Sequence, residues 1–138
     1  MEINYVFPCQ IRVRYGDTDK MGYCYYGNYP SFLEVGRVEA LRSLGISYKS
    51  MEESGVMMPV LDLKIKYLAP AFYDDLLTIQ TIVTKIEGTR IYFDYEIFNE
   101  EGKKLVIAHT VLVFVNANTM RPTSPPESFI NTLRHAIQ

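Results

Sequence analysis

Four segments rich in β-branched and aromatic residues occupy the second half of the chain and restrict its fold more than any other feature. They span residues 60–68, 76–87, 89–99 and 104–116, and their composition favours β-strands. Gly88 and residues 100–102 separate the last three segments by tight turns, which predicts an antiparallel meander. Alternation of apolar and charged residues at 10–15 predicts a fifth strand.

One long helix is expected before these strands, over residues 29–44. Asn28 or Tyr29 would cap it, and Pro30 would lie in its first turn. Apolar residues then recur at helical spacing. The small residues Gly36 and Ala40 lie on that stripe, where they would let another backbone approach closely.

Two shorter helical segments are expected as well. Residues 47–54 form a second helical or irregular stretch between the long helix and the strands. Near the end of the chain, Ser124-Pro125-Pro126-Glu127 has the pattern of a capping box with proline at the first position. This pattern predicts a short helix that ends near His135.

The predicted order of elements defines an α+β fold in which one long helix lies against a five-stranded antiparallel sheet. One helix cannot cover five long strands. Segment 104–116 also carries apolar residues on both of its faces, so the second face must meet something else, most simply a second copy of the chain. A homodimer is therefore the smallest expected assembly, and His109 is interpreted as a hydrogen-bonded core histidine.

Composition excludes several classes of protein. The chain has 138 residues and 15.9 kDa, which fits a single domain over 1–138. A net charge of −2 argues against nucleic acid as the main ligand, and no apolar run is long enough for a membrane span. Cys9 and Cys24 are interpreted as small buried thiols, and two cysteines do not make a disulfide framework, so a cytoplasmic location is expected. Four scattered His and Cys residues do not suggest a metal site.

The chemistry of the chain is concentrated between Asp17 and Glu34. Asp17 and Asp19 lie a few residues before a predicted helix N-terminus, whose amides can stabilise an oxyanion. A carboxylate beside these amides would act as a nucleophile or as a general base toward water. The same Gly-Asp-Thr-Asp sequence is also compatible with an Asx-turn in which the acids only shape the loop.

These residues resemble the start of a known family. Arg14-Tyr-Gly-Asp-Thr-Asp-Lys-Met-Gly22, followed by Asn28-Tyr29 and Glu34-Val-Gly-Arg37, is similar to the hotdog-fold acyl-CoA thioesterases of the 4-hydroxybenzoyl-CoA thioesterase family, including their Tol–Pal-associated branch. The similarity continues through 67–76 and 88–90 and so covers most of the chain. It implies a hotdog fold, with a long central helix wrapped by the sheet and assembled into homodimers or homotetramers.

The resemblance also implies catalytic roles. Asp19 takes the place of the catalytic carboxylate, as nucleophile or general base, and the backbone N–H of Tyr26 takes the place that polarises the thioester carbonyl. Asp17 is expected to shape the loop. Glu34 is expected near the site or as a solvated helix acid, and Arg37 is expected to pair with a carboxylate.

A further set of residues is implied in binding coenzyme A. The sequence Gly88-Thr89-Arg90 matches the turn that runs along the pantetheine and nucleotide. Arg90, together with Lys85, would contact the phosphates. An ordinary hairpin turn with an exposed arginine would have the same sequence pattern. Met58-Pro59-Val60 matches the lining of the acyl and pantetheine channel, and Pro59 is equally compatible with a simple edge-strand break. No cofactor is expected beyond the coenzyme A of the substrate.

Three residues depart from the family's pattern. Tyr26 stands where the Tol–Pal branch usually has a histidine, whereas the 4-hydroxybenzoyl branch also has tyrosine there. Met21 replaces a smaller residue, and Cys24 replaces a common β-branched one. The tyrosines at 23, 25 and 26 suit an aryl-acyl group or a subunit interface equally well. Competing interpretations are a thioesterase for acyl carrier protein and a non-catalytic acyl-binding protein of the same fold.

Overall fold

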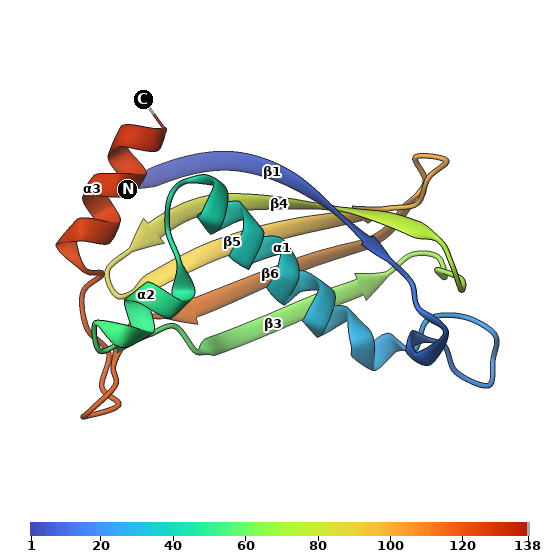
Figure 1. Ribbon diagram of the computed structural model, residues 1–138, viewed down its shortest axis with the longest axis horizontal. Coiled ribbons are helices and arrows are strands. Elements are labelled where there is room, and N and C mark those ends of the chain that lie inside the picture. The colour runs from blue at the N-terminus through green and yellow to red at the C-terminus, as the bar shows by residue number, and fades with distance from the viewer. Residues whose placement is uncertain (138) are drawn as a thin grey trace.

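The computed structural model describes residues 1–137 and contains a five-stranded antiparallel sheet with one long helix on one of its faces (Figure 1). The strands lie in the order β1-β4-β5-β6-β3. Their bounds are Glu2–Arg12 (β1), Val60–Tyr67 (β3), Leu76–Glu87 (β4), Arg90–Phe98 (β5) and Lys104–Val113 (β6). The predicted α+β fold, with five antiparallel strands and a long helix, is therefore confirmed.

Helix α1 (Tyr29–Ser43) crosses the inner face of the sheet and packs on β1 and β4. Leu33, Ala40 and Leu41 of the helix are fully buried against the sheet. The close approach predicted at Gly36 is present, because a Cβ atom there would lie 2.5 Å from Thr81 Oγ1. A side chain at this position would push the helix away from β4.

Six smaller elements complete the two ends of the sheet. Short 3-10 turns at Tyr15–Asp17 (η1) and Tyr26–Asn28 (η2) lie near the start of α1. At the opposite end are the helices α2 (Tyr48–Glu53) and α3 (Glu127–Ala136), and a small ribbon of β2 (Val56–Met57) with β7 (Val115–Asn116). Ser47 caps α2 by accepting a hydrogen bond from the Ser50 N–H at 3.3 Å.

Several predicted boundaries are wrong for identifiable reasons. The first strand begins at Glu2 rather than at residue 10, because its pairing with β4 continues past Pro8 to Lys85. The last strand is interrupted after Val113, and Val115–Asn116 pairs instead with β2. Helix α3 begins at Glu127 without a side-chain cap, so the capping box predicted at Ser124 does not form.

The two faces of β6 are less alike than the sequence suggested. Val106, Ala108 and Leu112 are fully buried on one face of the strand, whereas Ile107 and Val111 on the other face are half-buried. His109 lies on this outer face with 51% of its side chain exposed, and its Nδ1 lies 2.6 Å from Asp94 Oδ1. The prediction of a core histidine is therefore wrong in burial, although the hydrogen bond is present.

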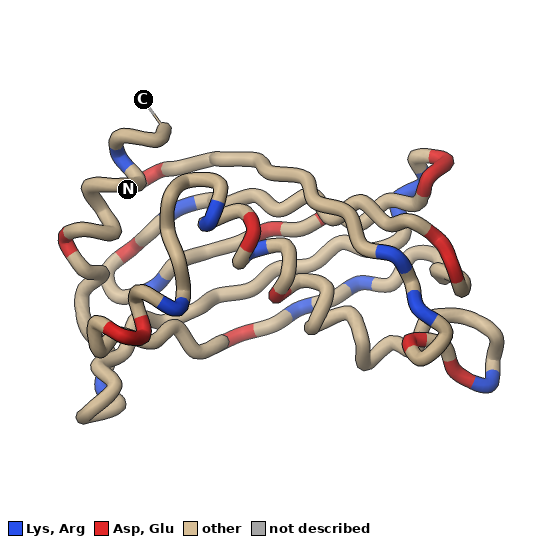
Figure 2. Tube along the Cα trace, viewed as in Figure 1, with Lys and Arg blue, Asp and Glu red and all other residues tan. Residues whose placement is uncertain are grey.

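Charged residues of both signs are interspersed along the chain trace and do not separate into an acidic and a basic region (Figure 2). None of the helices in residues 1–137 combines the length and apolar character needed to span a bilayer. Cys9 is half-buried, Cys24 is buried, and both are free thiols. The interpretation as a small buried thiol is confirmed for Cys24 and holds only in part for Cys9.

Candidate active site

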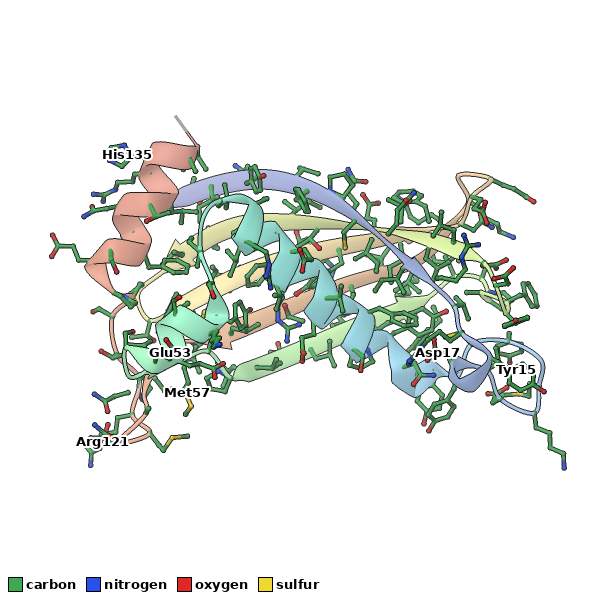
Figure 3. All side chains as sticks on the ribbon, viewed as in Figure 1. Tyr15, Asp17, Glu53, Met57, Arg121 and His135 are labelled. Atoms are coloured by element: carbon green, nitrogen blue, oxygen red, sulfur yellow. The ribbon has the colours of Figure 1, made fainter. Side chains whose placement is uncertain are left out.

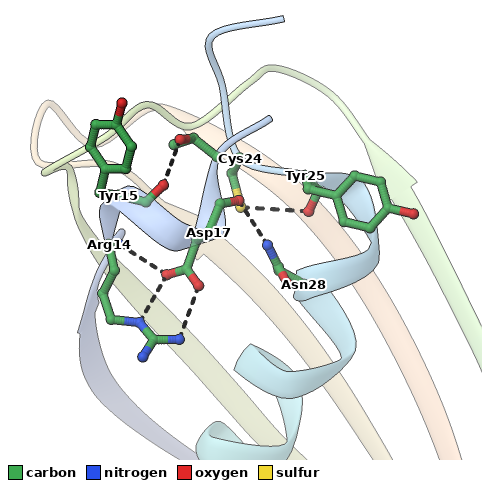
Figure 4. Close-up of polar contacts among 7 residues, drawn as sticks. Arg14, Tyr15, Asp17, Cys24, Tyr25 and Asn28 are labelled. Atoms are coloured by element: carbon green, nitrogen blue, oxygen red, sulfur yellow. Dashed lines mark hydrogen bonds and ion pairs between the residues drawn. The ribbon is translucent and has the colours of Figure 1, made fainter. Parts of the chain in front are cut away.

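The loop before α1 is organised around the buried carboxylate of Asp17, which is only 5% exposed. Asp17 Oδ2 accepts hydrogen bonds from Arg14 N at 2.9 Å and Arg14 Nε at 3.3 Å, and Oδ1 accepts one from Arg14 Nη2 at 3.1 Å (Figure 4). Burial raises the pKa of Asp17, but the hydrogen bonds from Arg14 lower it by more than burial raises it. The net pKa of Asp17 therefore lies below its usual value. The geometry agrees with the predicted structural role of Asp17.

The backbone of Asp17 also ties the loop to the helix. Its carbonyl oxygen accepts hydrogen bonds from the Tyr25 N–H at 2.8 Å and from Asn28 Nδ2 at 2.7 Å. The side chain of Asn28 thus anchors the loop instead of capping α1, where no side-chain cap is formed. These contacts hold the segment that carries Asp19 against the start of the helix.

Asp19 opens a tight turn that orients its carboxylate. The Asp19 N–H donates to Tyr23 O at 3.0 Å, and the Gly22 N–H donates to Asp19 O at 3.0 Å. Gly22 has a φ of 88°, which favours glycine at this position. Asp19 Oδ1 accepts a hydrogen bond from the Met21 N–H at 2.8 Å. The turn therefore fixes one carboxylate oxygen and leaves Oδ2 without a partner in the part of the chain that the structure describes.

A cavity of about 380 Å³ lies beside this carboxylate. It is lined by the loop, the start of α1 and the end of β3, through Asp19, Met21, Tyr23, Cys24, Tyr26, Tyr29, Tyr67, Leu68, Ala69 and Pro70. The rings of Tyr26 and Tyr29 both meet the ring of Tyr67 edge to face, with centroids 6.2 and 5.3 Å apart. We refer to this space as the Asp19 cavity.

Tyr26 is the first residue of η2, which runs directly into α1. An N–H at the first position of a helix has no acceptor within that helix. The carbonyl of Tyr26 is engaged differently, because it accepts a hydrogen bond from the Tyr67 hydroxyl at 3.1 Å. The Asp19 cavity is thus lined by Asp19 and Tyr26, the two residues that the family resemblance singled out.

Cys24 and Tyr29 form the buried wall of the Asp19 cavity. Burial raises the pKa of the Cys24 thiol to about 11 and raises the pKa of Tyr29 as well. Both groups are therefore uncharged at neutral pH. The contribution of Tyr29 and Tyr67 to this wall was not found from the sequence, where only the pairing of β3 with its neighbours would have placed Tyr67 near the helix start.

The other residues implied by the resemblance lie elsewhere. Glu34 is exposed on α1 and lines a second cavity of about 390 Å³ together with Met58, Pro59 and Val60. Gly88 borders a third cavity, Thr89 accepts a hydrogen bond from the Phe114 N–H at 2.8 Å, and Arg90 is exposed at the start of β5. The expected helper, Lys85, forms an ion pair with Glu87 at 3.1 Å.

The Asp19 cavity and the Gly88–Arg90 turn lie at opposite ends of the sheet. Figure 3 shows Tyr15 and Asp17 at one end and Glu53 and Met57 at the other. Strand β4 connects the two ends, and its length corresponds to a separation on the order of 35 Å. One chain therefore does not bring the predicted catalytic residues and the predicted coenzyme A residues together.

The remaining expectations concern metal ligands and Arg37. In residues 1–137 no group of three or more His, Cys, Asp or Glu side chains is placed to hold a metal ion.

Arg37 was expected to pair with a carboxylate, and this is wrong for the described chain. The side chains that form ion pairs there are Arg12, Arg14, Arg42, Lys85, Lys104 and His109 with their acidic partners.

A long helix packed on one face of a five-stranded antiparallel sheet is the arrangement of the hotdog fold. Residues 13–133 match the family described as the thioesterase-like superfamily, and the chain belongs to this family. The family resemblance and the hotdog fold predicted from the sequence are therefore confirmed.

Individual relatives cover nearly the whole chain. The acyl-CoA thioester hydrolase YbgC of Escherichia coli O6:H1 is 35% identical over 125 residues, which is 91% of this chain and 93% of that protein. The acyl-CoA thioesterase YbgC of Haemophilus influenzae is 31% identical over 130 residues, 94% of this chain and 95% of that protein. The structure of a DHNA-CoA thioesterase from Staphylococcus aureus has a TM-score of 0.88 and 34% identity, and the match covers 95% of this chain and 87% of that one.

Proposed function

We propose that this protein is an acyl-CoA thioesterase that hydrolyses the thioester of an acyl-CoA to the free acid and coenzyme A. The observation that carries the proposal is the presence of Asp19 and Tyr26 in the lining of one cavity at the start of the helical segment. The names of the two relatives described above, an acyl-CoA thioester hydrolase and an acyl-CoA thioesterase, support it.

The chemistry requires two functions at the thioester carbonyl. The Tyr26 N–H, reinforced by the positive end of the helix, stabilises the negative charge that develops on the carbonyl oxygen. Asp19 either attacks the carbonyl carbon to form an anhydride, which water then hydrolyses, or takes a proton from a water that attacks directly. In both routes the C–S bond breaks, and coenzyme A leaves as the thiolate and takes up a proton. These steps use protein groups alone, so the proposal includes no metal and no cofactor other than the coenzyme A of the substrate.

The active form is proposed to be a homodimer, or a homotetramer built from such dimers. Strand β3 is an edge strand, and it exposes Val60, Leu61, Leu63 and Tyr67 by 42–51%. An exposed apolar edge of this kind is suited to pairing with another strand. An antiparallel pairing of two β3 strands about a two-fold axis would carry the Val60 end of one chain toward the Tyr67 end of its partner.

Such a pairing would complete the site. It would bring Met58, Pro59, Val60 and Glu34 of one protomer, together with its Gly88-Thr89-Arg90 turn, toward the Asp19 cavity of the other. Met58–Val60 would then line the acyl and pantetheine channel, and Arg90 would contact the phosphates of coenzyme A as the expected basic group. The two free thiols fit a reducing compartment, so we place the enzyme in the cytoplasm.

The test is hydrolysis of a panel of short aliphatic, long aliphatic and aryl acyl-CoAs, followed through the free thiol, for wild type and Asp19→Asn. Asparagine keeps the shape of the side chain and removes its charge. We expect a loss of at least about 100-fold in kcat, because general-base or nucleophilic assistance contributes at least this much. Asp74→Asn is the control, since Asp74 is an exposed carboxylate at the same end of the molecule with a φ of 69°, which asparagine tolerates.

Three other results would contradict the proposal or part of it. Equal turnover of wild type and Asp19→Asn would remove Asp19 from the mechanism. Hydrolysis of acyl carrier protein thioesters but of no acyl-CoA would identify the carrier protein as the substrate. Binding of acyl-CoA without turnover would identify a non-catalytic acyl-binding protein.

A further inference from the structure

The hydroxyl group of Tyr67 joins the end of strand β3 to the turn in front of α1. It donates a hydrogen bond to the carbonyl oxygen of Tyr26 at 3.1 Å, although the two residues are 41 positions apart in the chain. Both residues line the Asp19 cavity. The contact therefore lies beside the groups to which the proposed mechanism assigns the chemistry, and that mechanism does not yet use it.

The middle of the turn η2 is held differently from its flanks. The flanks are anchored by the carbonyl oxygen of Asp17, as described above. In the middle, the carbonyl of Tyr26 accepts the N–H of Tyr29, which closes a 3-10 turn. Hydrogen bonds of 3-10 turns have poorer geometry than those of an α-helix, and Gly27 makes the backbone conformationally permissive. The Tyr67 hydroxyl thus supplies a contact from outside the turn where the turn itself is weak.

Tyr67 is itself held firmly enough to serve as an anchor. The two residues that follow it, Leu68 and Ala69, donate their N–H groups to Leu105 O at 2.8 and 3.2 Å. Its ring packs edge to face on the ring of Tyr29, which is only 2% exposed, and such packing favours one orientation of the ring. Partial burial raises the pKa of Tyr67, so its hydroxyl keeps its proton and stays a donor at neutral pH.

The hydrogen bond to the Tyr26 carbonyl also restricts the Tyr26 N–H. The two groups are joined through one Cα atom, and only two soft dihedral angles separate them. A donor to a developing oxyanion must lie about 2.7–3.1 Å from the oxygen, so a small rotation of the turn would weaken the interaction. Fixing the carbonyl of Tyr26 is therefore a way to fix its N–H.

We propose that Tyr67 is a positioning residue for thioester hydrolysis, whose hydroxyl holds the Tyr26 carbonyl so that the Tyr26 N–H keeps the orientation needed to stabilise the oxyanion. Tyr67 acts through Tyr26 and does not touch the reacting atoms. The inference rests on the proposed thioesterase function. It does not depend on the proposed dimer, because both tyrosines and Asp19 belong to one chain and one cavity.

The kinetic test is Tyr67→Phe, which keeps the ring contacts and removes the hydroxyl. We expect kcat to fall by about 5- to 10-fold on the acyl-CoA that wild type hydrolyses best, as for the loss of one hydrogen bond, while KM changes by less than about twofold. This loss is smaller than the 100-fold or more expected when an oxyanion donor itself is removed, at about 100- to 1000-fold. Tyr5→Phe is the matched control, because the Tyr5 hydroxyl lies 2.7 Å from Ser43 Oγ and joins β1 to the end of α1.

A spectroscopic test asks whether the carbonyl itself is affected. The substrate analogue is the same acyl-CoA with a methylene group in place of the thioester sulfur, which is a ketone and is not hydrolysed. Its isotope-labelled carbonyl stretch should shift to lower frequency on binding to wild type, because a donated hydrogen bond polarises the C=O bond. In Tyr67→Phe the frequency should move back toward its value in buffer, and in Tyr5→Phe it should equal that of wild type.

The outcomes separate this inference from the function on which it rests. An unchanged kcat in Tyr67→Phe overturns the inference and leaves the thioesterase in place. A rise in KM at constant kcat also overturns it, because Tyr67 would then contact the acyl group. A fall in kcat without a change in the carbonyl frequency means that Tyr67 only supports the fold, which is likewise contrary to the inference. Absence of hydrolysis of every acyl-CoA by wild type refutes the proposed function and the inference with it.

Discussion

The two ends of the sheet differ in the kind of chemistry that they carry. At the start of α1, Asp19 and Tyr26 bring a carboxylate and a backbone amide to one cavity. At the opposite end, Met58–Val60 lines an apolar cavity and Arg90 offers an exposed positive charge. The first end carries the residues that we propose to react and the second those that we propose to bind coenzyme A, and a single chain holds the two ends far apart. The difference teaches that, in the proposed dimer, one site would be built from residues of two chains.

The edges of the sheet repeat this contrast. Strand β1 is the edge strand on one side of the sheet. It contains Pro8, and its pairing register shifts between Glu2 and Tyr5. Proline and irregular register are devices that prevent edge strands from associating. Strand β3 ends the other side with a run of exposed apolar residues. Only β3 has the character of an interface, and it is the edge that would join unlike ends of two chains.

The largest expected effect comes from breaking that edge. Leu63→Glu places a charge on a β3 residue that is 42% exposed in the single chain, so the monomer should still fold. We expect a monomer by native mass, since a buried unpaired charge prevents association. We also expect a loss of at least about 100-fold in activity, because under the proposed dimer an isolated chain would hold only half of the site. Val6→Glu on β1, where the side chain is 46% exposed, is the matched control.

The outcome of this experiment bears directly on the comparison of the ends. A Leu63→Glu protein that remains dimeric would place the interface elsewhere. A wild-type protein that is monomeric at micromolar concentration, yet fully active, would mean that each chain holds a complete site.

A smaller effect is expected from the binding end. Arg90→Gln would remove the proposed charge-assisted contact to a phosphate of coenzyme A. Such a contact is worth about 1.5 kcal/mol, which corresponds to a rise of about tenfold in KM for acyl-CoA. The thioester of N-acetylcysteamine lacks phosphates, so its hydrolysis should not change. Measurement of KM for both substrates separates phosphate binding from a general loss of function. Arg121→Gln, another exposed arginine near the same end, should leave both values unaltered.

The sequence predicted the elements of the fold well where composition and turns agreed. The strand at 76–87 has the predicted bounds, because Gly88 ends it with a φ of 61° and its inward residues alternate with half-buried ones. The predicted burial of His109 was wrong. Both faces of its strand carry apolar residues, and this pattern does not reveal which face the helix covers. The early start of β1 was missed because Pro8 interrupts its strand-like composition.

For the candidate site as well, the local sequence was informative, whereas contacts between distant segments could not be predicted. Asp19 and Tyr26 were selected through the family resemblance, and both line one cavity because a short loop connects them at the start of the helical segment. Their catalytic roles stay a prediction. The role of Tyr67 and the unpaired state of Arg37 were not predictable, because both depend on contacts between segments distant in the sequence. Nothing local in the sequence around Arg37 distinguishes an arginine with a carboxylate partner from one surrounded by tyrosines.

The smallest expected effect concerns the loop that holds the reactive end together. Asp17→Asn removes the ion pair with Arg14 but keeps the shape of the side chain, and Arg14 is largely solvent-exposed, which weakens the pair. We expect the free energy of unfolding at neutral pH to fall by about 1 kcal/mol, as for the loss of one or two hydrogen bonds. Urea unfolding of wild type and variant measures the difference.

The stability difference between wild type and Asp17→Asn should depend on pH. The pKa of Asp17 is lowered in the folded protein, so the carboxylate contributes stability above its unfolded pKa, about 3.9, and that contribution disappears as the pH falls through the folded value. The gap between wild type and Asp17→Asn should therefore be full at neutral pH and should close progressively below about pH 4. Asp19→Asn serves as the control within the same loop, since its partly exposed carboxylate accepts one local hydrogen bond and its removal should alter stability by less than about 0.5 kcal/mol. A larger stability loss in Asp19→Asn than in Asp17→Asn would reverse the roles of the two acids, with Asp19 holding the loop and Asp17 left as the candidate for catalysis.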